Sequence, residues 1–377
     1  MPYYLVTYFF NSFSLYIKKD QRKYIERLGL ILLIFLSGTR YCLAGSDYYV
    51  YENVFNKSAH TLDVLRYIFT GVNNGVNINY EPGFLLLNSI VKDMGFNYHG
   101  FIFIVAVIFY LLFYFGIKKY TDKWGLVACL FMYKLMFYNT FISIRQGLTI
   151  ALFIYGLKYI IDNKPIKYFI LCFICYYIHR ASLFLFPLYF CRYIPVSKKI
   201  LRNVAVLFIP TWFIRNAINL EGPIMSIISF IGFEQKSEGW ASPIEGISLI
   251  HTLECYIIIF LVLYFWDKLD MKDNTQKIMV QLLLILIPIF TLLSNWILFT
   301  RLKDYLVIVY AILLSYIIAK SSNENSNSIR GIKYLKLVRP AFLICCLIGM
   351  VRYVMVFDGG VLMNYDSFLF HFLSIFS

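Results

Sequence analysis

The sequence predicts an all-α, polytopic membrane protein, and three observations predict it. Of its 377 residues, 60% are hydrophobic and only 15% are charged, whereas an ordinary soluble domain is about 45–50% apolar and about 25% charged. Apolar runs recur from the first residues to the last, so a soluble domain with one anchor does not account for them. Alternation of apolar and polar residues is not the dominant pattern, which argues against a membrane β-barrel. We therefore expect one integral membrane domain over residues 1–377, with about 11 to 13 membrane segments, some short or re-entrant.

The apolar segments follow one another between short basic loops. Long segments that we expect to be helical cover about residues 3–17, 28–44, 101–117, 124–142, 145–161, 204–218, 247–266, 278–298, 302–319 and 340–357. Shorter pieces cover 82–94, 166–178 and 181–193. About 13 residues of helix reach only about 20 Å, so the piece after Glu81 is expected to be re-entrant or too short to span. The two halves on either side of His179-Arg180 are expected to form a hairpin, because basic loops flank both ends.

The positive charge of the chain lies in the loops between these segments. The net charge of +14 is spread over many short loops, as the positive-inside rule requires, whereas a nucleic-acid-binding face would be clustered. No nucleic-acid partner is therefore predicted. With the basic loops in the cytoplasm, the polar segments at about 45–81 and 220–246 face outward, and a linker at about 320–338 is cytoplasmic. No cleavable signal peptide is expected, because the first cations, Lys18 and Lys19, follow the first apolar run.

This orientation places several charged side chains near the outer membrane boundary, where few arginines are expected. A cation at a helix centre costs about 2.5–3.5 kcal/mol on insertion scales, so such residues sit at a boundary, in a protein-lined cavity or in a functional site. The residues are Arg40, Arg145, His179, Arg180, Arg301 and Arg352, with the acids Asp47, Glu81, Asp304 and Asp358. In one interpretation each arginine pairs with a nearby acid, as a structural ion pair. In the other, several arginines surround one cavity that binds a pyrophosphate, which suits the planar guanidinium.

His179 and Glu81 are candidates for acid–base chemistry in such a cavity. Histidine ordinarily titrates near the working pH of an enzyme, although a lone histidine on an apolar face is more often a hydrogen-bonded structural residue. Glu81 precedes Pro82 and Gly83, an arrangement that starts a helix and places a carboxylate at its positive end.

No metal or other cofactor is predicted. The other histidines show no metal-ligand spacing, and Cys172 and Cys175 form a lone CxxC inside an apolar segment. Buried free thiols are a better interpretation than zinc or redox chemistry. No nucleotide-binding motif is present either.

Five short motifs occur in order along most of the chain. They are GTRYCLAGSDYYVY, which contains Arg40 and Asp47; EPGFLLLN, which begins at Glu81; RQG, which begins at Arg145; HRASLFLFPLYF, which begins at His179; and the pair Arg301 and Tyr305. With these motifs the chain resembles the EpsG-like family of bacterial exopolysaccharide and O-antigen polymerases, the Wzy-type enzymes. It departs from the family pattern at Ala181, where a hydroxyl residue is usual, and at Asn364, where proline is common.

The resemblance implies a metal-independent glycosyltransferase with a GT-C-like helical fold, in the cytoplasmic membrane of a bacterium. Its substrates would be polyprenyl-pyrophosphate-linked oligosaccharides at the outer face of that membrane, joined into O-antigen, capsule or exopolysaccharide. Membrane lipid would surround it, and a flippase and a chain-length regulator would be its partners. The base that deprotonates the acceptor would be His179, Asp47 or Glu81. The substrate's pyrophosphate and sugars would be bound by Arg145, Gln146, Arg301, Arg40, Arg180 and Tyr305.

Three other classes of protein remain as alternatives. A lipid-linked oligosaccharide flippase would place cations in a central cavity and show repeated halves, and no repeat is visible. A membrane acyltransferase would need a catalytic histidine that faces an acyl donor. A purely structural scaffold would not need arginines at the outer face.

Overall fold

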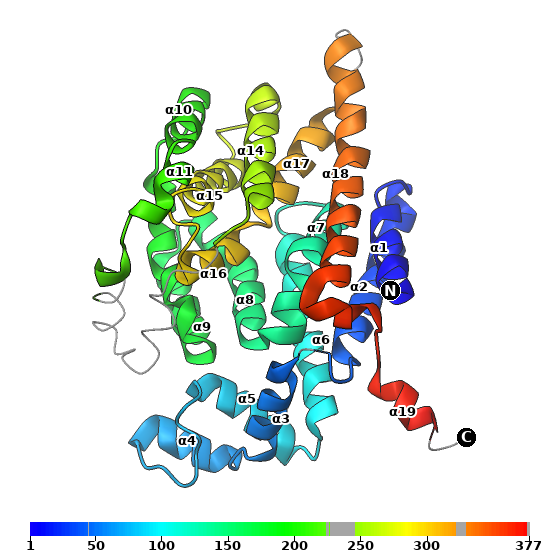
Figure 1. The fold of residues 1–377 in the computed structure, drawn as a ribbon, viewed down its shortest axis with the longest axis vertical. Helices are drawn as coiled ribbons and strands as arrows, with labels where there is room; N and C mark the ends of the chain where they lie inside the picture. Colours follow the sequence, from blue (N-terminus) through cyan, green and yellow to red (C-terminus); the bar gives the residue numbers. More distant parts are fainter. Residues whose placement is uncertain (44, 224–225, 227–245, 322–328, 375–377) are drawn as a thin grey trace. The chain divides into compact units, whose positions relative to one another are not determined.

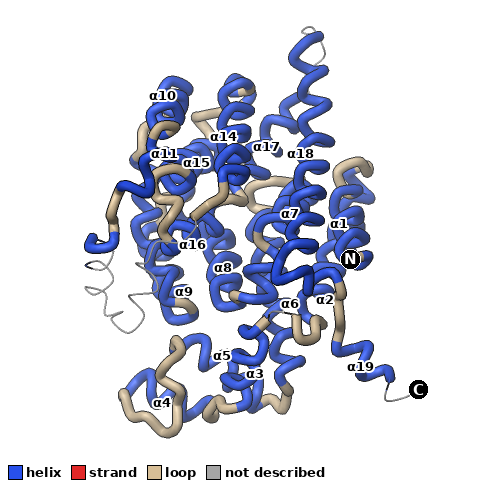
Figure 2. The backbone as a smooth tube through the Cα atoms, in the orientation of Figure 1, coloured by secondary structure: helices blue, strands red, loops and turns tan. Residues whose placement is uncertain are grey.

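The structure is a computed structural model that describes residues 1–43, 45–223, 226, 246–321 and 329–374. These residues form helices and loops (Figure 2). An isolated β-bridge joins Arg40 to Ser367. The predicted all-α, polytopic membrane class is confirmed. The number of membrane crossings stays a prediction.

The chain divides into two compact units. Unit 1 comprises residues 1–159, 165–186 and 333–377, and unit 2 comprises residues 160–164 and 187–332. Each unit is described by itself. That the whole chain is one membrane domain stays a prediction.

Unit 1 contains α1 to α9 except for the last two residues of α8, together with η1 and the C-terminal helices (Figure 1). Its elements are α1 Pro2–Phe13, α2 Lys19–Gly38, α3 Ser46–Asn56, α4 Thr61–Thr70, α5 Pro82–Asp93, α6 Tyr98–Ile117, α7 Trp124–Lys134, the π-helix η1 Phe137–Ile142, α8 Ile144–Ile161, α9 Pro165–Ile178, most of α18 Ile329–Val356, the 3-10 segment η6 Phe357–Met363 and α19 Phe368–Ser374. The 3-10 helix η2, Arg180–Tyr193, begins in unit 1 and continues into unit 2.

Unit 2 contains the remaining helices of the described residues. They are α10 Lys198–Phe208, α11 Thr211–Ile214, the 3-10 turn η3 Arg215–Ala217, α14 Leu249–Tyr264, the 3-10 turn η5 Trp266–Lys268, α15 Asn274–Phe290, α16 Ile297–Leu306 and α17 Val309–Ser321. Helix α15 is the centre of this unit, because α10, α14, α16 and α17 all pack against it. Most of its side chains are apolar and buried, which explains this central place.

Four described segments are long and apolar enough to cross a membrane: Tyr98–Ile117, Ile144–Ile161, Ile297–Lys320 and Leu337–Met363. The shorter apolar helices are Trp124–Lys134, Pro165–Ile178, Leu249–Tyr264 and Asn274–Phe290. The piece after Glu81 forms the 12-residue helix α5, which is shorter than the roughly 20 residues that a crossing needs. This agrees with the expectation that it does not span.

Several helix ends differ from the sequence-based expectation. The basic stretch after the first apolar run is helical, since α2 begins at Lys19; its lysines, arginines and glutamate are good helix formers. For the same reason α18 begins at Ile329, within the predicted linker 320–338, and continues through Pro340. The expected helix 124–142 ends at Lys134 and is continued by η1. Most of the predicted outer segment 220–246 lies outside the described residues.

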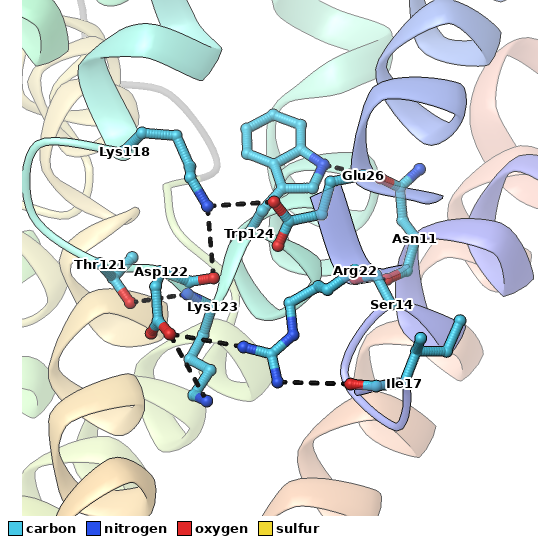
Figure 3. A network of polar contacts seen from close by, with 10 residues as sticks. All are labelled: Asn11, Ser14, Ile17, Arg22, Glu26, Lys118, Thr121, Asp122, Lys123 and Trp124. Carbon is cyan, nitrogen blue, oxygen red and sulfur yellow. Dashed lines mark hydrogen bonds and ion pairs between the residues drawn. The ribbon is translucent and has the colours of Figure 1, made fainter. Parts of the chain in front are cut away.

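A polar network ties the first helices of unit 1 together (Figure 3). Lys118 Nζ donates to Glu26 Oε2 at 3.0 Å, and Arg22 lies 3.4 Å from an oxygen of Asp122. On the other side of Glu26, the indole nitrogen of Trp124 donates to Asn11 at 2.9 Å. These contacts connect α1, α2, the start of α7 and the loop after α6. They lie among lysines and arginines that the sequence predicts to be cytoplasmic, and this orientation stays a prediction.

Candidate functional site

Three distant segments of unit 1 bring charged side chains together at their helix ends. Glu81 directly precedes α5, Arg145 is the second residue of α8, and His179 lies between α9 and η2. The helix α5 packs against α9, which sets the first of these residues beside the third. All three side chains are largely withdrawn from solvent, with exposed fractions of 8% for Glu81, 15% for Arg145 and 6% for His179.

The carboxylate of Glu81 is the centre of this cluster. Its Oε2 accepts a hydrogen bond from Nη1 of Arg145 within an ion pair. Its Oε1 lies 3.6 Å from Nδ1 of His179 and accepts a hydrogen bond of 3.2 Å from the backbone N–H of Arg180. One carboxylate thus orients a guanidinium and an imidazole at the same time. We call Glu81, Arg145, His179 and Arg180 the charged cluster.

Aromatic rings surround the guanidinium of Arg145. Its central carbon lies 5.2 Å from the ring centroid of Tyr80 and 5.6 Å from those of Tyr51 and Phe84. The Tyr51 hydroxyl also accepts a hydrogen bond of 3.3 Å from Nε. Rings at such distances attract a cation through their quadrupole and hold it in place. Arg145 begins a helix, where the helix dipole disfavours a cation, so these contacts and the Glu81 carboxylate offset that cost.

Two glycines of the family-like motifs permit the close packing at this cluster. A Cβ on Gly83 would lie 2.8 Å from the carbonyl oxygen of Tyr177, so only glycine lets α5 approach the end of α9. A Cβ on Gly147 would overlap the carbonyl oxygen of Asn139, so glycine also lets the start of α8 approach η1. The motifs EPG and RQG therefore place their charged residues by backbone contact.

The surroundings of Glu81 favour its charged form. Burial by itself would raise its pKa, but the His179 side chain, the Arg145 charge and the Arg180 N–H outweigh burial and hold the pKa of Glu81 well below its ordinary value. The pKa of the neighbouring Tyr51 hydroxyl shifts upward instead, because burial raises it more than the Arg145 charge lowers it. At neutral pH Glu81 is therefore a carboxylate, and the adjacent Tyr51 is a neutral phenol.

Arg40 is in the same unit but has a different environment. It is 2% exposed, and its guanidinium donates to the carbonyl oxygens of Ser37 at 2.6 Å and Phe141 at 3.1 Å. The Phe141 ring lies 5.2 Å from its central carbon. These contacts join the end of α2 to η1. In this structure Arg40 therefore stabilises the packing of unit 1. Its role in substrate binding stays a prediction.

Two other predicted residues also lie in unit 1. Asp47 is in the first turn of α3, one turn before Tyr51. Its negative charge contributes to the raised pKa of the Tyr51 hydroxyl. Asp47 therefore lies on the helix face that approaches Arg145. Gln146 follows Arg145 but is fully buried at 0% exposure, so its side chain belongs to the interior of the unit.

Arg301 and Tyr305 belong to unit 2, on α16. They are one helical turn apart, with Arg301 partly exposed and Tyr305 buried at 2%. The neighbouring Asp304 is 3.2 Å from Lys303 Nζ. Whether Arg301 and Tyr305 serve the same substrate as the charged cluster stays a prediction.

Sequence reasoning assigned no role to Tyr51, Tyr80 and Phe84, which hold Arg145, or to the pairing of Glu81 with Arg145. A signal was present for Tyr51 and Phe84, since both lie within the family-like motifs. Tyr80 directly precedes Glu81.

A search of curated proteins and a search of solved structures each find no match for the chain. The model of the EpsG family matches residues 24–367, and so includes all residues of the charged cluster. This match extends over most of the chain, which therefore belongs to the EpsG family.

Proposed function

We propose that the protein is a polysaccharide polymerase that joins polyprenyl-pyrophosphate-linked oligosaccharides at the outer face of the bacterial cytoplasmic membrane. Membership of the EpsG family supports a polymerase-like role on lipid-linked sugars in general. The observation that carries the finer proposal is the charged cluster, in which one carboxylate holds both an arginine and a histidine at buried helix ends. A flippase that delivers the substrate and a regulator of chain length are proposed partners.

In the proposed reaction, a hydroxyl oxygen of the acceptor sugar attacks the anomeric carbon of the donor sugar. The new C–O bond forms as the bond from that carbon to the pyrophosphate oxygen breaks. The leaving pyrophosphate keeps the electron pair, and the acceptor's proton passes to the base.

His179 is the proposed base, with Glu81 as the residue that positions it. A general base works best when its pKa lies near the operating pH, and the pKa of Glu81 is far below that range. Histidine ordinarily titrates close to neutral pH. The contact of Nδ1 with Glu81 would orient the ring and stabilise the imidazolium that forms when the proton arrives, as the carboxylate of a catalytic triad does.

Arg145 is the proposed ligand of the pyrophosphate. Its contacts with Tyr51 and Glu81 use Nε and Nη1, and a guanidinium has further N–H donors in the same plane. Fixed donors of this kind stabilise charge as it develops on a leaving group. Arg180 and, from unit 2, Arg301 are proposed additional cations. Because arginines neutralise the phosphate charge, the proposed reaction uses no metal ion.

The substitution Arg145→Ala tests the proposal. Loss of one preorganised charged donor should lower the rate by about 10²–10³-fold, so a strain with this variant should lack long polymer and accumulate single repeat units on lipid outside the cytoplasm. Arg66→Ala is a matched control, since Arg66 is an exposed arginine on α4 of the same unit. It should leave the polymer unchanged.

The lipid-linked sugar profile separates the competing functions. Normal long-chain polymer from a stably inserted Arg145→Ala variant would contradict the proposed role of Arg145. In a deletion strain, repeats trapped inside the cell would indicate a flippase, and intact polymer without acetyl groups would indicate an acyltransferase.

A further inference from the structure

The C-terminal tail of unit 1 returns to the end of α2 and is held there by its backbone. The N–H of Tyr41 donates to the carbonyl of Asp366, and the N–H of Phe368 donates to the carbonyl of Thr39, both at 3.0 Å. The hydroxyl of Tyr365 donates to the carbonyl of Leu36 at 3.1 Å. Residues 365–368 are therefore held beside the end of α2.

This position brings aromatic and imidazole rings into one group. The ring centroids of Tyr41 and His371 are 4.5 Å apart, those of Tyr41 and His99 are 5.7 Å apart, and those of His99 and Phe368 are 4.9 Å apart. Asp366 lies at the edge of this group, with Oδ2 at 2.8 Å from Nε2 of His371. We call these five residues the tail platform.

The tail platform is accessible and has a polar edge. The side chains of His371 and Asp366 are 55% and 41% exposed. Tyr41, His99 and Phe368 are half-buried, so each keeps part of its surface in contact with solvent. An aromatic cluster that served only for packing would not need an exposed carboxylate and imidazole at its edge.

Helix α3 touches both the tail platform and the charged cluster, through tyrosines that are one helical turn apart. The hydroxyl of Tyr48 is 3.3 Å from Nδ1 of His99, and the hydroxyl of Tyr51 accepts from Arg145 at 3.3 Å. Residues three apart in a helix share a face and are separated by about 4.5 Å along the axis. The same helix therefore contacts one residue of the tail platform and one residue of the charged cluster.

We propose that the tail platform binds sugar rings of the glycan substrate beside the site of bond formation, an inference that rests on the proposed polymerase function. A sugar ring has an apolar face of C–H groups, which packs on aromatic rings, and a rim of hydroxyls, which bind carboxylates and imidazoles. Binding sites of this kind combine apolar, aromatic walls with a few polar groups that fix orientation. The carboxylate of Asp366 disfavours an anion at this position, so the platform fits the sugars and not the pyrophosphate.

A membrane-interface belt is the competing explanation, because tyrosines often lie at the headgroup level. A belt would anchor the protein through ring surface alone. It would tolerate the loss of the Asp366 charge and would have no affinity for a soluble glycan. These differences make the two explanations separable.

The test is a binding measurement on the full-length protein purified in detergent. The probe is a set of lipid-free oligosaccharides, cut from the surface polysaccharide of the source organism, and binding is followed by saturation-transfer NMR and titration calorimetry. We expect Asp366→Asn and His371→Ala each to weaken binding by about tenfold, which corresponds to about 1.4 kcal/mol. Tyr41→Leu, which keeps an apolar side chain without the ring, should weaken it as well.

Phe69→Ala on α4 is the matched control, since Phe69 is 81% exposed and lies outside the tail platform. It should bind the oligosaccharides as the unchanged protein does. Wild-type affinity in both Asp366→Asn and His371→Ala, or no binding by the unchanged protein, would overturn the proposal. Because the probe contains no pyrophosphate, Arg145→Ala should still bind it. Loss of polymer in Arg145→Ala together with unaltered binding in the platform variants would reject the platform and leave the polymerase function standing.

Discussion

At the scale of single residues, two arginines show how a buried cation can be stabilised in different ways. Arg145 has a carboxylate partner, Glu81, and a set of aromatic rings. Arg40 has backbone carbonyls and one ring. From the sequence both arginines are equally unusual, because an apolar neighbourhood does not reveal which distant group packs against them. The sequence could therefore predict which residues were exceptional, but the pairing of Glu81 with Arg145 and His179 required the contact between α5 and α9.

The contact between Glu81 and His179 leads to a prediction about pH. The pKa of Glu81 lies well below its ordinary value, so Glu81 stays ionised throughout the neutral range. If His179 is the base, protonation of its ring should cause the fall in turnover on the acid side of the pH profile. His179→Gln should lower kcat by about 10²–10⁴-fold, with little change in KM for the lipid-linked substrate, and should remove this acid limb. The measurement is turnover of purified enzyme between pH 5 and pH 8.

Glu81→Gln is the companion variant, because it keeps the size of the side chain and removes its charge. We expect lower kcat with the acid limb still present, since His179 remains. A pH profile of His179→Gln that keeps the acid limb would show that another group is the base. Asp47, on the same face of α3 as Tyr51, would then be the next candidate.

At the scale of helices, the sequence located the apolar cores better than the helix ends. The expected segments 101–117 and 145–161 differ by three residues or fewer from Tyr98–Ile117 and Ile144–Ile161. The expected start of the second apolar run at residue 28 differs by nine residues from Lys19. Hydropathy reports which residues can enter lipid, whereas a helix continues into water wherever its residues favour helix formation. The change from α7 to the π-helix η1 was also not predicted, because hydropathy does not distinguish a π-helix from an α-helix.

The approach of α5 to α9 gives a prediction at the same scale. In Gly83→Ala the added Cβ would be 2.8 Å from the Tyr177 carbonyl oxygen, and because that atom belongs to the backbone, one helix must move. Overpacking of this kind costs about 1–3 kcal/mol. Glu81 and His179 lie on either side of this contact, so polymerase activity should fall more than the thermal stability of the protein. Activity and the unfolding midpoint in detergent are the two measurements.

Gly222→Ala provides the control for this substitution. Among the described residues, no atom lies within 4 Å of a Cβ built on Gly222, so the change should be neutral or slightly stabilising. If Gly83→Ala were as active and as stable as Gly222→Ala, close approach of α5 and α9 would not be what positions the charged cluster.

At the scale of the whole molecule, the division into two units separates the predicted site residues. The charged cluster, Arg40 and Asp47 belong to unit 1, and Arg301 and Tyr305 belong to unit 2. From the positive-inside rule, the sequence predicted that Arg145, His179 and Glu81 lie on one side of the membrane. In the structure Glu81 contacts both Arg145 and His179. Helix length and loop charge restrict which helix ends can meet, and the side of the membrane on which these three residues lie stays a prediction. No such rule restricts how two compact units meet, so a shared site for Arg145 and Arg301 stays a prediction.

The network around Glu26 connects four parts of unit 1 and gives a prediction about its stability. Glu26 is 2% exposed, and burial raises its pKa although Lys118 opposes this shift. The folded protein thus holds a proton on Glu26 more tightly than the unfolded chain does, and ionising this carboxyl costs folding free energy as the pH rises. Lys118→Met would remove the main opposing charge. It should destabilise the protein by about 3 kcal/mol, the lower end of the range for breaking a buried pair, because Lys118 is 30% exposed.

The loss should be larger at pH 8 than at pH 5, because protonation of Glu26 at the lower pH relieves the uncompensated charge. Thermal unfolding midpoints in detergent at the two pH values measure this. Adding Glu26→Gln to Lys118→Met should recover much of the loss at pH 8, since no buried charge then remains. Lys164→Met is the control, because Lys164 is 49% exposed and pairs with Asp162, only two residues away in the chain. Exposed ion pairs contribute little to the free energy of unfolding, so this variant should be about as stable as the unchanged protein. An equal loss for Lys118→Met at both pH values would mean that the packing of the lysine stem, and not the charge of Glu26, makes this network important for the stability of unit 1.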